Sequence, residues 1–79
     1  MTIQQCKYVL EILKVGSFNE ASKTLYIAQS SLSASVKSLE SELNIKIFER
    51  SNNGVCLRND GAEFVRYASQ IIEQNNFIL

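Results

Sequence analysis

The sequence predicts a mainly α-helical fold, namely a winged helix-turn-helix (three helices plus a two-stranded β-hairpin wing) followed by a long linker helix. Two helical segments, 18–25 and 29–43, are separated by only three residues, which is the spacing of a helix-turn-helix. The apolar period then shortens to two residues around Asn53-Gly54, a strong signal for a hairpin turn. A last helical stripe starts near Asp60 and continues toward the end of the chain.

The first helix is expected over residues 3–14. Gly16 is placed to end it, because glycine readily adopts the left-handed conformation of a helix C-cap. Five apolar residues recur at helical spacing and are expected to face the core: Ile3, Cys6, Val9, Leu10 and Leu13.

The second helix is expected from Phe18 to about Leu25. Ser17 and Glu20 form an S-x-x-E capping box, in which the serine hydroxyl and the glutamate side chain each accept a backbone N–H. Ala21 is small enough to let another helix approach closely. Phe18 is expected to fill the core rather than to stack on a base.

The third helix carries the stretch "AQSSLSASVKSLE", residues 28–40, in which five of thirteen residues are serine. Serine costs roughly 0.5 kcal/mol relative to alanine inside a helix, so this helix depends on its packing. Ala28 continues the apolar spacing of the face that is expected to point at the core: Leu32, Val36, Leu39 and Leu43. The opposite face is short, polar and free of carboxylates until Glu40 and Glu42 near the C-terminal end, and it carries Gln29, Ser30, Ser33, Ala34, Lys37 and Ser41.

The hairpin is expected to pair the runs 45–50 and 55–58. Alternating apolar residues predict one buried and one open face for each strand. On this pattern Cys56 points to solvent, whereas Phe48 is a core residue. Arg50 leaves two interpretations open, a contact with a phosphate or an ion pair with a nearby carboxylate.

The fourth helix is expected to start after the compact unit is complete, with Asp60 and Glu63 as a cap-like D-x-x-E pair. Its apolar stripe is longer than a small core needs, which favours a helix–helix seam in a dimer over simple closure of the core. The stripe consists of Phe64, Ala68, Ile71, Ile72, Ile78 and Leu79.

The composition excludes several classes of site. The chain has no histidine and two cysteines, so a four-ligand zinc site and histidine-based triads are absent, and we predict neither an enzyme nor a metal or cofactor site. No apolar run reaches the roughly 20 residues of a membrane span, and no signal peptide is visible, which predicts a cytoplasmic protein without a membrane contact and with free thiols. The zero net charge argues against non-specific coating of DNA.

Residues 16–61, "GSFNEASKTLYIAQSSLSASVKSLESELNIKIFERSNNGVCLRNDG", resemble the N-terminal DNA-binding domain of LysR-type transcriptional regulators. The segments that carry the resemblance are "GSF…A…L", the "Q…LS…LE…L" of the third helix, and "IFER". The resemblance implies a helix-turn-helix at 18–37 with residues 29–43 as the recognition helix in the major groove. It also implies a wing near the minor groove, a fourth helix that pairs two subunits, and a larger effector-binding domain that is absent from this chain.

The resemblance further implies contacts residue by residue. The positions of Gln29, Ser30 and Ala34 face bases in the family, and that of Ser33 meets a phosphate. This chain departs from the family at three positions. It has Ala28, Ser30 and Ala34 where family members usually carry serine, proline and arginine, in that order. Loss of the arginine removes guanine recognition at residue 34 and leaves apolar contact with a thymine methyl group. The wing tip (Asn52, Asn53, Gly54) and Cys56 also lack the basic residues often found there.

These observations predict a sequence-specific DNA-binding transcription regulator that binds an inverted-repeat operator in double-stranded DNA as a homodimer. A small-molecule effector would act only through the missing C-terminal domain. The alternative is a winged-helix module for protein interaction with little or no DNA binding. We divide the chain into a winged helix-turn-helix domain, 1–58, and a linker or dimerisation helix, 59–79.

Three sets of site residues follow from this prediction. In the recognition helix the predicted DNA-binding residues are Gln29, Ser30, Ser31, Ser33, Ala34 and Lys37. Lys37 is within reach of backbone phosphates, and a plain solvated lysine is the alternative. In the wing they are Arg50, Asn52 and Asn53, and the predicted dimerisation residues are Phe64, Ala68, Ile71 and Ile72.

Overall fold

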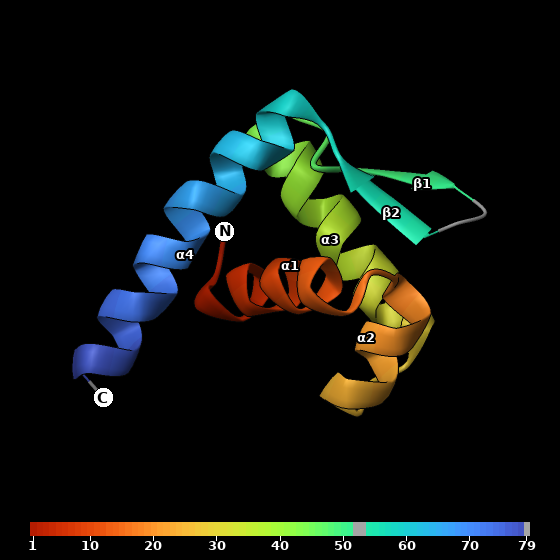
Figure 1. The fold of residues 1–79 in the computed structure, drawn as a ribbon, viewed down its shortest axis with the longest axis horizontal. Coiled ribbons are helices and arrows are strands. Elements are labelled where there is room, and N and C mark those ends of the chain that lie inside the picture. The colour runs from red at the N-terminus through yellow and green to blue at the C-terminus, as the bar shows by residue number, and fades with distance from the viewer. Residues whose placement is uncertain (52–53, 79) are drawn as a thin grey trace.

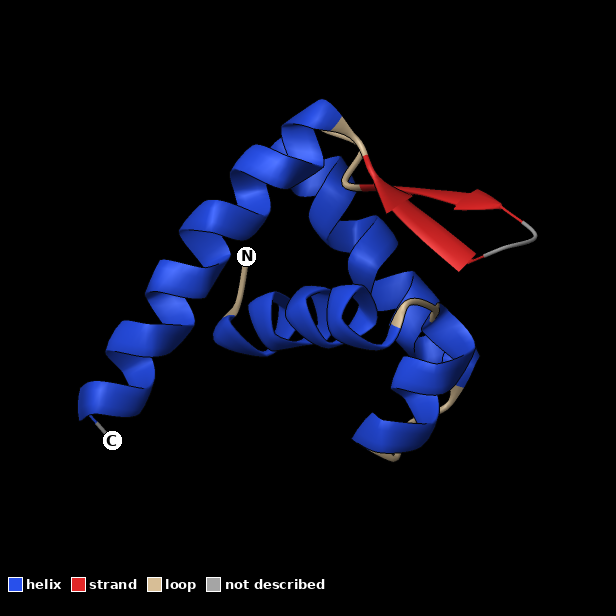
Figure 2. Cartoon of the chain, viewed as in Figure 1, coloured by secondary structure: helices blue, strands red, loops and turns tan. Residues whose placement is uncertain are grey.

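The computed structural model describes residues 1–51 and 54–78, and it is mainly helical, as predicted. Helix α1 is followed by the close pair α2 and α3, then by a β-hairpin and a long last helix (Figures 1 and 2). The hairpin and the C-terminal half of α4 extend from the helical core in different directions (Figure 1). The elements are α1 Ile3–Val15, α2 Phe18–Leu25, α3 Gln29–Leu43, β1 Phe48–Ser51, β2 Gly54–Leu57 and α4 Asn59–Ile78.

A single core joins all four helices and the start of the hairpin. It includes Cys6, Phe18 and Phe48, which confirms that these three residues are structural. The buried hydrophobic residues are Cys6, Val9, Ile12, Phe18, Ala21, Leu32, Val36, Leu39, Ile47, Phe48, Phe64 and Ala68.

The buried stripe of α1 differs from the predicted one at its edges. Ile12 is fully buried, whereas Ile3 and Leu13 are 39% and 38% exposed, so the expectation that these two face the core is wrong. The buried residues of α1 are thus Cys6, Val9 and Ile12, which follow one another at a spacing of three residues.

Both ends of α1 are capped. Gly16 ends the helix as predicted, with φ +90° and an N–H that donates to the Ile12 carbonyl at 2.8 Å. The N-terminus has a capping box that the sequence reasoning missed. The Thr2 hydroxyl accepts from the Gln5 N–H at 3.0 Å, and the Gln5 side chain accepts from the Thr2 N–H at 2.9 Å.

The cap of α2 is only half of the predicted box. The Ser17 hydroxyl accepts from the Glu20 N–H at 3.0 Å, whereas the Glu20 carboxylate lies 3.5 Å from the Lys23 ammonium group. Helix α2 ends at Leu25, and its C-cap residue Tyr26 has the left-handed φ of +58°. Helix α3 then starts after Ala28, which is exposed and therefore does not belong to the core-facing row.

The hairpin is antiparallel and starts later than predicted. Strand β1 begins at Phe48 rather than at residue 45, because α3 holds the preceding segment: the Ile45 N–H donates to the Glu40 carbonyl, and the Ile47 N–H donates to the Glu40 carboxylate. Ile47 and Phe48 are both buried, so the predicted alternation fails at this point. In β2 it holds, because Cys56 is exposed between two half-buried residues.

The start of β2 is anchored to the turn between α1 and α2. The ladder pairs Ser51 with Gly54, so Gly54 lies in β2 and not in the turn predicted for Asn53-Gly54. The Val55 N–H donates to the Gly16 carbonyl at 3.2 Å. A Cβ atom on Gly54 would lie 2.5 Å from the same carbonyl oxygen, and its φ is +116°, so only glycine fits there.

Helix α4 is part of the core, contrary to the expectation that the compact unit is complete before it. Phe64 and Ala68 are buried, and α4 packs mainly along α1. The helix begins at Asn59, and its first N–H bond runs from Ala62 to the Arg58 carbonyl at 2.8 Å. Asp60 is therefore inside the first turn, so the predicted cap-like pair with Glu63 is wrong, and Asp60 instead offers a negative charge to the helix dipole.

Candidate nucleic-acid interface

The outward face of α3 presents the side chains that the sequence singled out. Ser33 is half-buried and turned toward the hairpin, and the other residues of this set are open to solvent. The exposed members are Gln29, Ser30, Ser31, Ala34 and Lys37.

The N-terminus of α3 carries no side-chain cap. The helical hydrogen bonds start with the Leu32 N–H, which donates to the Ala28 carbonyl at 3.0 Å. The N–H groups of residues 29–31 precede this bond and form the positive end of the helix dipole. An anion beside this end would meet backbone donors, small hydroxyl groups and no carboxylate of α3.

Both carboxylates of α3 are engaged by other parts of the chain. The Glu40 carboxylate accepts the backbone N–H groups of Ile47 and Phe48 at 2.7 and 3.3 Å. The Glu42 carboxylate pairs with the N-terminal ammonium group of Met1. Lys37 is the single cationic residue of α3 and is exposed, so the outward face is neutral to weakly positive although the chain has no net charge.

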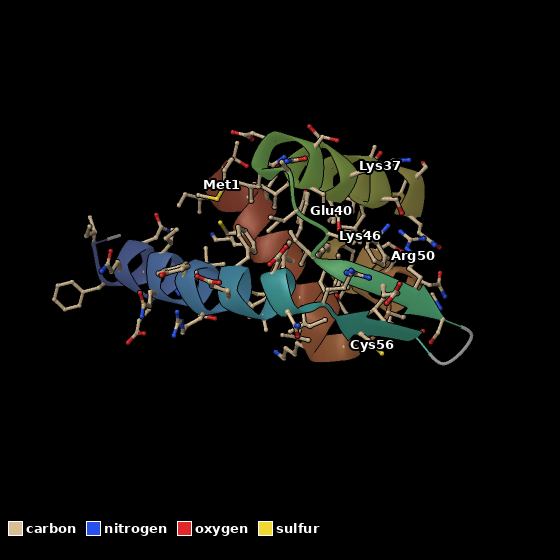
Figure 3. All side chains as sticks on the ribbon, turned by 90° about the horizontal axis from the view of Figure 1, so that it is seen from above. Met1, Lys37, Glu40, Lys46, Arg50 and Cys56 are labelled. Carbon is tan, nitrogen blue, oxygen red and sulfur yellow. The ribbon has the colours of Figure 1, made fainter. Side chains whose placement is uncertain are left out.

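A groove of about 540 Å³ runs between α3 and β1. Phe18, Val36 and Phe48 line its apolar floor. Figure 3 shows the labelled Lys37, Glu40, Lys46 and Arg50 along this gap, whereas Cys56 lies on the hairpin away from it. The polar rim consists of Ser33, Lys37, Glu40, Lys46, Glu49 and Arg50.

Arg50 connects the wing to α3. Its Nη2 donates to the Ser33 Oγ at 2.7 Å, and its Cζ lies 3.6 Å from the centroid of the Phe18 ring. The ion pair of the hairpin joins Glu49 to Arg58 at 3.3 Å instead. The predicted ion pair of Arg50 with a carboxylate is therefore wrong within the described residues, because a hydroxyl and an aromatic ring occupy its guanidinium group. The sequence shows no local signal for this contact, which joins residues 17 and 32 positions apart.

Two predicted wing residues, Asn52 and Asn53, lie outside the described residues. The predicted dimerisation residues fall into two classes. Phe64 and Ala68 are 9% and 0% exposed within a single chain, which leaves little of their surface for a partner; they close the core, as the alternative interpretation had it. Ile71 and Ile72 are half-buried.

The sequence reasoning missed the most exposed aromatic residue at the C-terminal end of α4. Phe77 is 91% exposed and Ile78 is 79% exposed, and both border a shallow surface with Gln70, Glu73 and Gln74. The predicted stripe included Ile78 but not Phe77. Leu79 lies outside the described residues.

The two thiols have different surroundings. Cys6 is buried and Cys56 is exposed, and both are free. Burial raises the pKa of the Cys6 thiol above its usual value, and the positive N-terminus opposes this effect in part.

Over the described residues there is no group of three or more acidic, histidine or cysteine side chains that could hold a metal ion. In the same residues, each helix falls short of the length or the hydrophobicity that a bilayer crossing requires.

Comparison with known proteins identifies relatives of this arrangement. Residues 3–62 match the family described as "Bacterial regulatory helix-turn-helix protein, lysR family". The uncharacterized HTH-type transcriptional regulator YcgK of Bacillus subtilis is 39% identical over 79 residues, which is all of this chain and 24% of the relative. The chain thus spans about a quarter of the length of the curated relatives it matches.

The similar solved structures include DNA complexes. The CbnR DNA-binding domain bound to DNA superposes with a TM-score of 0.91 at 29% identity, over 96% of this chain and 87% of the other. The BenM DNA-binding domain with catB site 1 DNA superposes with a TM-score of 0.92 at 29% identity, over 99% and 84%. The order of elements, the short turn before α3 and the family match agree, and the chain belongs to the lysR family of bacterial regulatory helix-turn-helix proteins.

Proposed function

We propose that this chain is the DNA-binding part of a sequence-specific transcription regulator. The observation that carries the proposal is the outward face of α3, whose solvent-exposed residues before Lys37 are short or polar and lack carboxylates. A helix in the major groove needs such side chains, since carboxylates would be repelled by phosphates. The likeness to the DNA-bound CbnR and BenM domains supports the same function.

Within this proposal α3 lies in the major groove and the hairpin approaches the minor groove. Gln29 pairs with an adenine through its amide, and Ala34 contacts a thymine methyl group. The hydroxyl of Ser33 and the ammonium group of Lys37 bind backbone phosphates, which position the helix without reading sequence. We also assign DNA contacts to Asn52 and Asn53 of the wing.

Dimerisation is assigned to α4. Ile71 and Ile72 are half-buried, and Phe77 and Ile78 add exposed apolar surface in the last turns. Two copies joined along this helix would place two α3 helices in successive major grooves of an inverted repeat. On this division, residues 1–58 form the DNA-binding unit and 59–79 the linker helix, although Phe64 and Ala68 pack into the core of that unit.

The longer relatives support a regulator with a further part. Since the chain spans about a quarter of their length, we assign the control by a small-molecule effector to a C-terminal domain outside this chain. Binding to chromosomal DNA requires a cytoplasmic protein, and no catalytic role is proposed.

Two observations favour a second candidate, a winged-helix module for protein interaction. The net charge is zero, and the guanidinium group of Arg50, the arginine nearest to α3, is already occupied by Ser33 and Phe18. A surface with so few free cations gains little from the release of counterions on DNA.

A mobility-shift assay with the upstream region of the chain's own gene separates the two functions. Binding to this duplex by a verified dimer, with a random duplex of equal length binding more weakly, supports the regulator. If the verified dimer shifts no promoter fragment, the interaction module becomes the better account.

A further inference from the structure

We propose that Arg50 is a positioning residue, which joins the wing to α3 and fixes the Ser33 hydroxyl as a hydrogen-bond donor toward a DNA phosphate, without neutralising a phosphate itself. The inference rests on the proposed DNA-binding function and assigns a role to one contact inside that site. It is carried by the geometry at the junction of β1 with α3.

The guanidinium group is fixed by a rigid aromatic platform. The Arg50 Cζ lies 3.6 Å from the Phe18 centroid, so the guanidinium group covers that ring. Phe18 is only 6% exposed, and its ring meets Phe48 edge-on, with centroids 5.7 Å apart and an interplanar angle of 79°. A planar guanidinium stacks on such a ring, whereas the compact ammonium of lysine cannot stack in the same way.

The hydrogen bond between Arg50 and Ser33 has a fixed direction. An arginine side chain carries donors only, so its Nη2 donates and the Ser33 Oγ accepts, at 2.7 Å. The hydroxyl hydrogen of Ser33 is then free to point elsewhere. A phosphodiester oxygen accepts hydrogen bonds and cannot donate them, so it is a suitable partner for this hydrogen.

The chain itself offers a contrast to Ser33. The Ser22 hydroxyl donates back to the Asn19 carbonyl at 2.7 Å, the usual way in which a helical serine uses its hydrogen. Among the residues that the structure describes, the Ser33 hydroxyl makes no such bond within its own helix, and its one hydrogen bond is the one received from Arg50. The Ser33 hydroxyl can thus donate its hydrogen to a partner outside the chain, at the edge of the outward face of α3.

The dependence of DNA affinity on salt distinguishes a positioning arginine from a phosphate-binding one. Each cation that neutralises a phosphate contributes about 1 to the slope of log affinity against log salt. A neutral serine hydroxyl contributes nothing to this slope. Loss of Arg50 should therefore weaken binding and leave the slope unchanged, whereas loss of the exposed Lys37 should reduce it.

The test is a fluorescence-anisotropy titration of the dimeric chain at several salt concentrations, with the upstream duplex and the random duplex as probes. We expect Arg50→Gln and Ser33→Ala each to weaken binding roughly fivefold, with the wild-type slope. The double variant should bind no more weakly than either single variant, because both remove the same contact. Arg50→Lys should behave like Arg50→Gln, and Lys37→Gln should lower the slope by about 1.

Thermal unfolding of each free variant shows whether it folds. If the Arg50 variants do not fold, the DNA affinities of Ser33→Ala and Ser33→Thr still test the role of the hydroxyl. Threonine keeps the hydroxyl and should retain the DNA affinity that alanine loses. A slope lowered by about 1 in Arg50→Gln and restored in Arg50→Lys would mean a direct phosphate contact and would overturn the inference while the proposed function stands. Additive effects in the double variant, or equal affinity of the two Ser33 variants, would also overturn it. Absence of binding by the wild-type dimer to either duplex would remove the proposed function and this inference together.

Discussion

Gly61 of α4 lies directly against the backbone of Ile47. A Cβ atom on Gly61 would collide with the Ile47 carbonyl oxygen and would lie 2.8 Å from its carbonyl carbon. That carbonyl also accepts the Arg58 N–H at 3.0 Å, so it cannot move aside without losing a hydrogen bond. This contact brings the start of α4, the end of β2 and the segment before β1 together at one point.

The first prediction concerns this contact. Gly61→Ala should destabilise the chain by about 2 kcal/mol, because the cost of overpacking exceeds the gain of roughly 1 kcal/mol in helix propensity. The reverse change at the exposed neighbour, Ala62→Gly, should cost only about 1 kcal/mol and serves as the control. Urea denaturation measures both, and a more stable Gly61→Ala variant would contradict the close packing.

The second prediction concerns the uncapped start of α3. Ala28 has φ −67° and ψ 142°, an extended conformation that suits a helix N-cap, but its side chain accepts no hydrogen bond. Ala28→Ser should therefore raise the free energy of unfolding by about 1 kcal/mol. Ser17→Ala, which removes the cap of α2, should lower it by about 1 kcal/mol under the same conditions. An unchanged melting temperature for Ala28→Ser would show that the N-terminus of α3 is satisfied in another way.

These caps show which features the sequence reveals by itself. Ser17 and Gly16 act within one helical turn of their own positions, so local chemistry predicts them correctly. Phe64 and Ala68 follow the same helical pattern as a dimer seam would, and only their packing along α1 decides that they belong to the core. A periodic pattern identifies a buried face but not the partner that buries it.

The candidate site shows the same limit. The outward face of α3 could be listed from the spacing of its apolar residues, and every residue listed for it is exposed except Ser33, which is half-buried. The bonds of Glu40 to the segment before β1 and of Arg50 to Ser33 could not be predicted, because they depend on the path of the chain between helix and hairpin. That path also explains why β1 starts at Phe48 rather than at residue 45.

The third prediction concerns Glu40. Its carboxylate accepts the N–H groups of Ile47 and Phe48, so Glu40→Ala should destabilise the chain by roughly 1–3 kcal/mol by leaving half-buried donors without a partner. Glu40→Gln keeps one acceptor oxygen and should cost less. Glu42→Gln affects an exposed pair with the N-terminus and should change the stability by about 0.5 kcal/mol or less. Equal effects of the alanine and glutamine variants would argue against the hydrogen bonds.

The fourth prediction concerns the thiols and pH. Because burial raises the pKa of Cys6, the folded chain keeps this proton at a pH where the unfolded chain loses it. The contribution of Cys6 to stability is thus complete below the unfolded thiol pKa of roughly 8.5 and is lost as the pH rises toward the folded pKa. Denaturation of Cys56→Ser between neutral and alkaline pH measures this loss without the exposed thiol.

Thiol labelling of the native chain checks the same burial. Cys56 should react quickly with a disulfide reagent, and Cys6 only as the chain opens. In Cys56→Ser the native chain should therefore be nearly unreactive. Rapid labelling of that variant would contradict the buried position of Cys6.

The fifth prediction concerns association along α4. Phe77→Ser removes a side chain that is 91% exposed, so it should leave the thermal stability of the monomer unchanged and weaken dimerisation at least tenfold. Asn76→Ser, at the neighbouring exposed position, is the matched control and should associate like the wild type. Sedimentation equilibrium measures both, and unchanged association of Phe77→Ser would exclude this end of α4 from the dimer contact.

The outward face of α3 is the central claim, and the DNA affinity of two variants that each add one carboxylate tests it most directly. Ser30 and Gln4 are both exposed, but Gln4 lies on α1, outside the outward face of α3. Measured on the upstream duplex by fluorescence anisotropy, Ser30→Glu should abolish detectable binding, whereas Gln4→Glu should remain within about threefold of the wild type. Wild-type affinity of Ser30→Glu, or an equal loss in both variants, would contradict the assignment of this face to DNA.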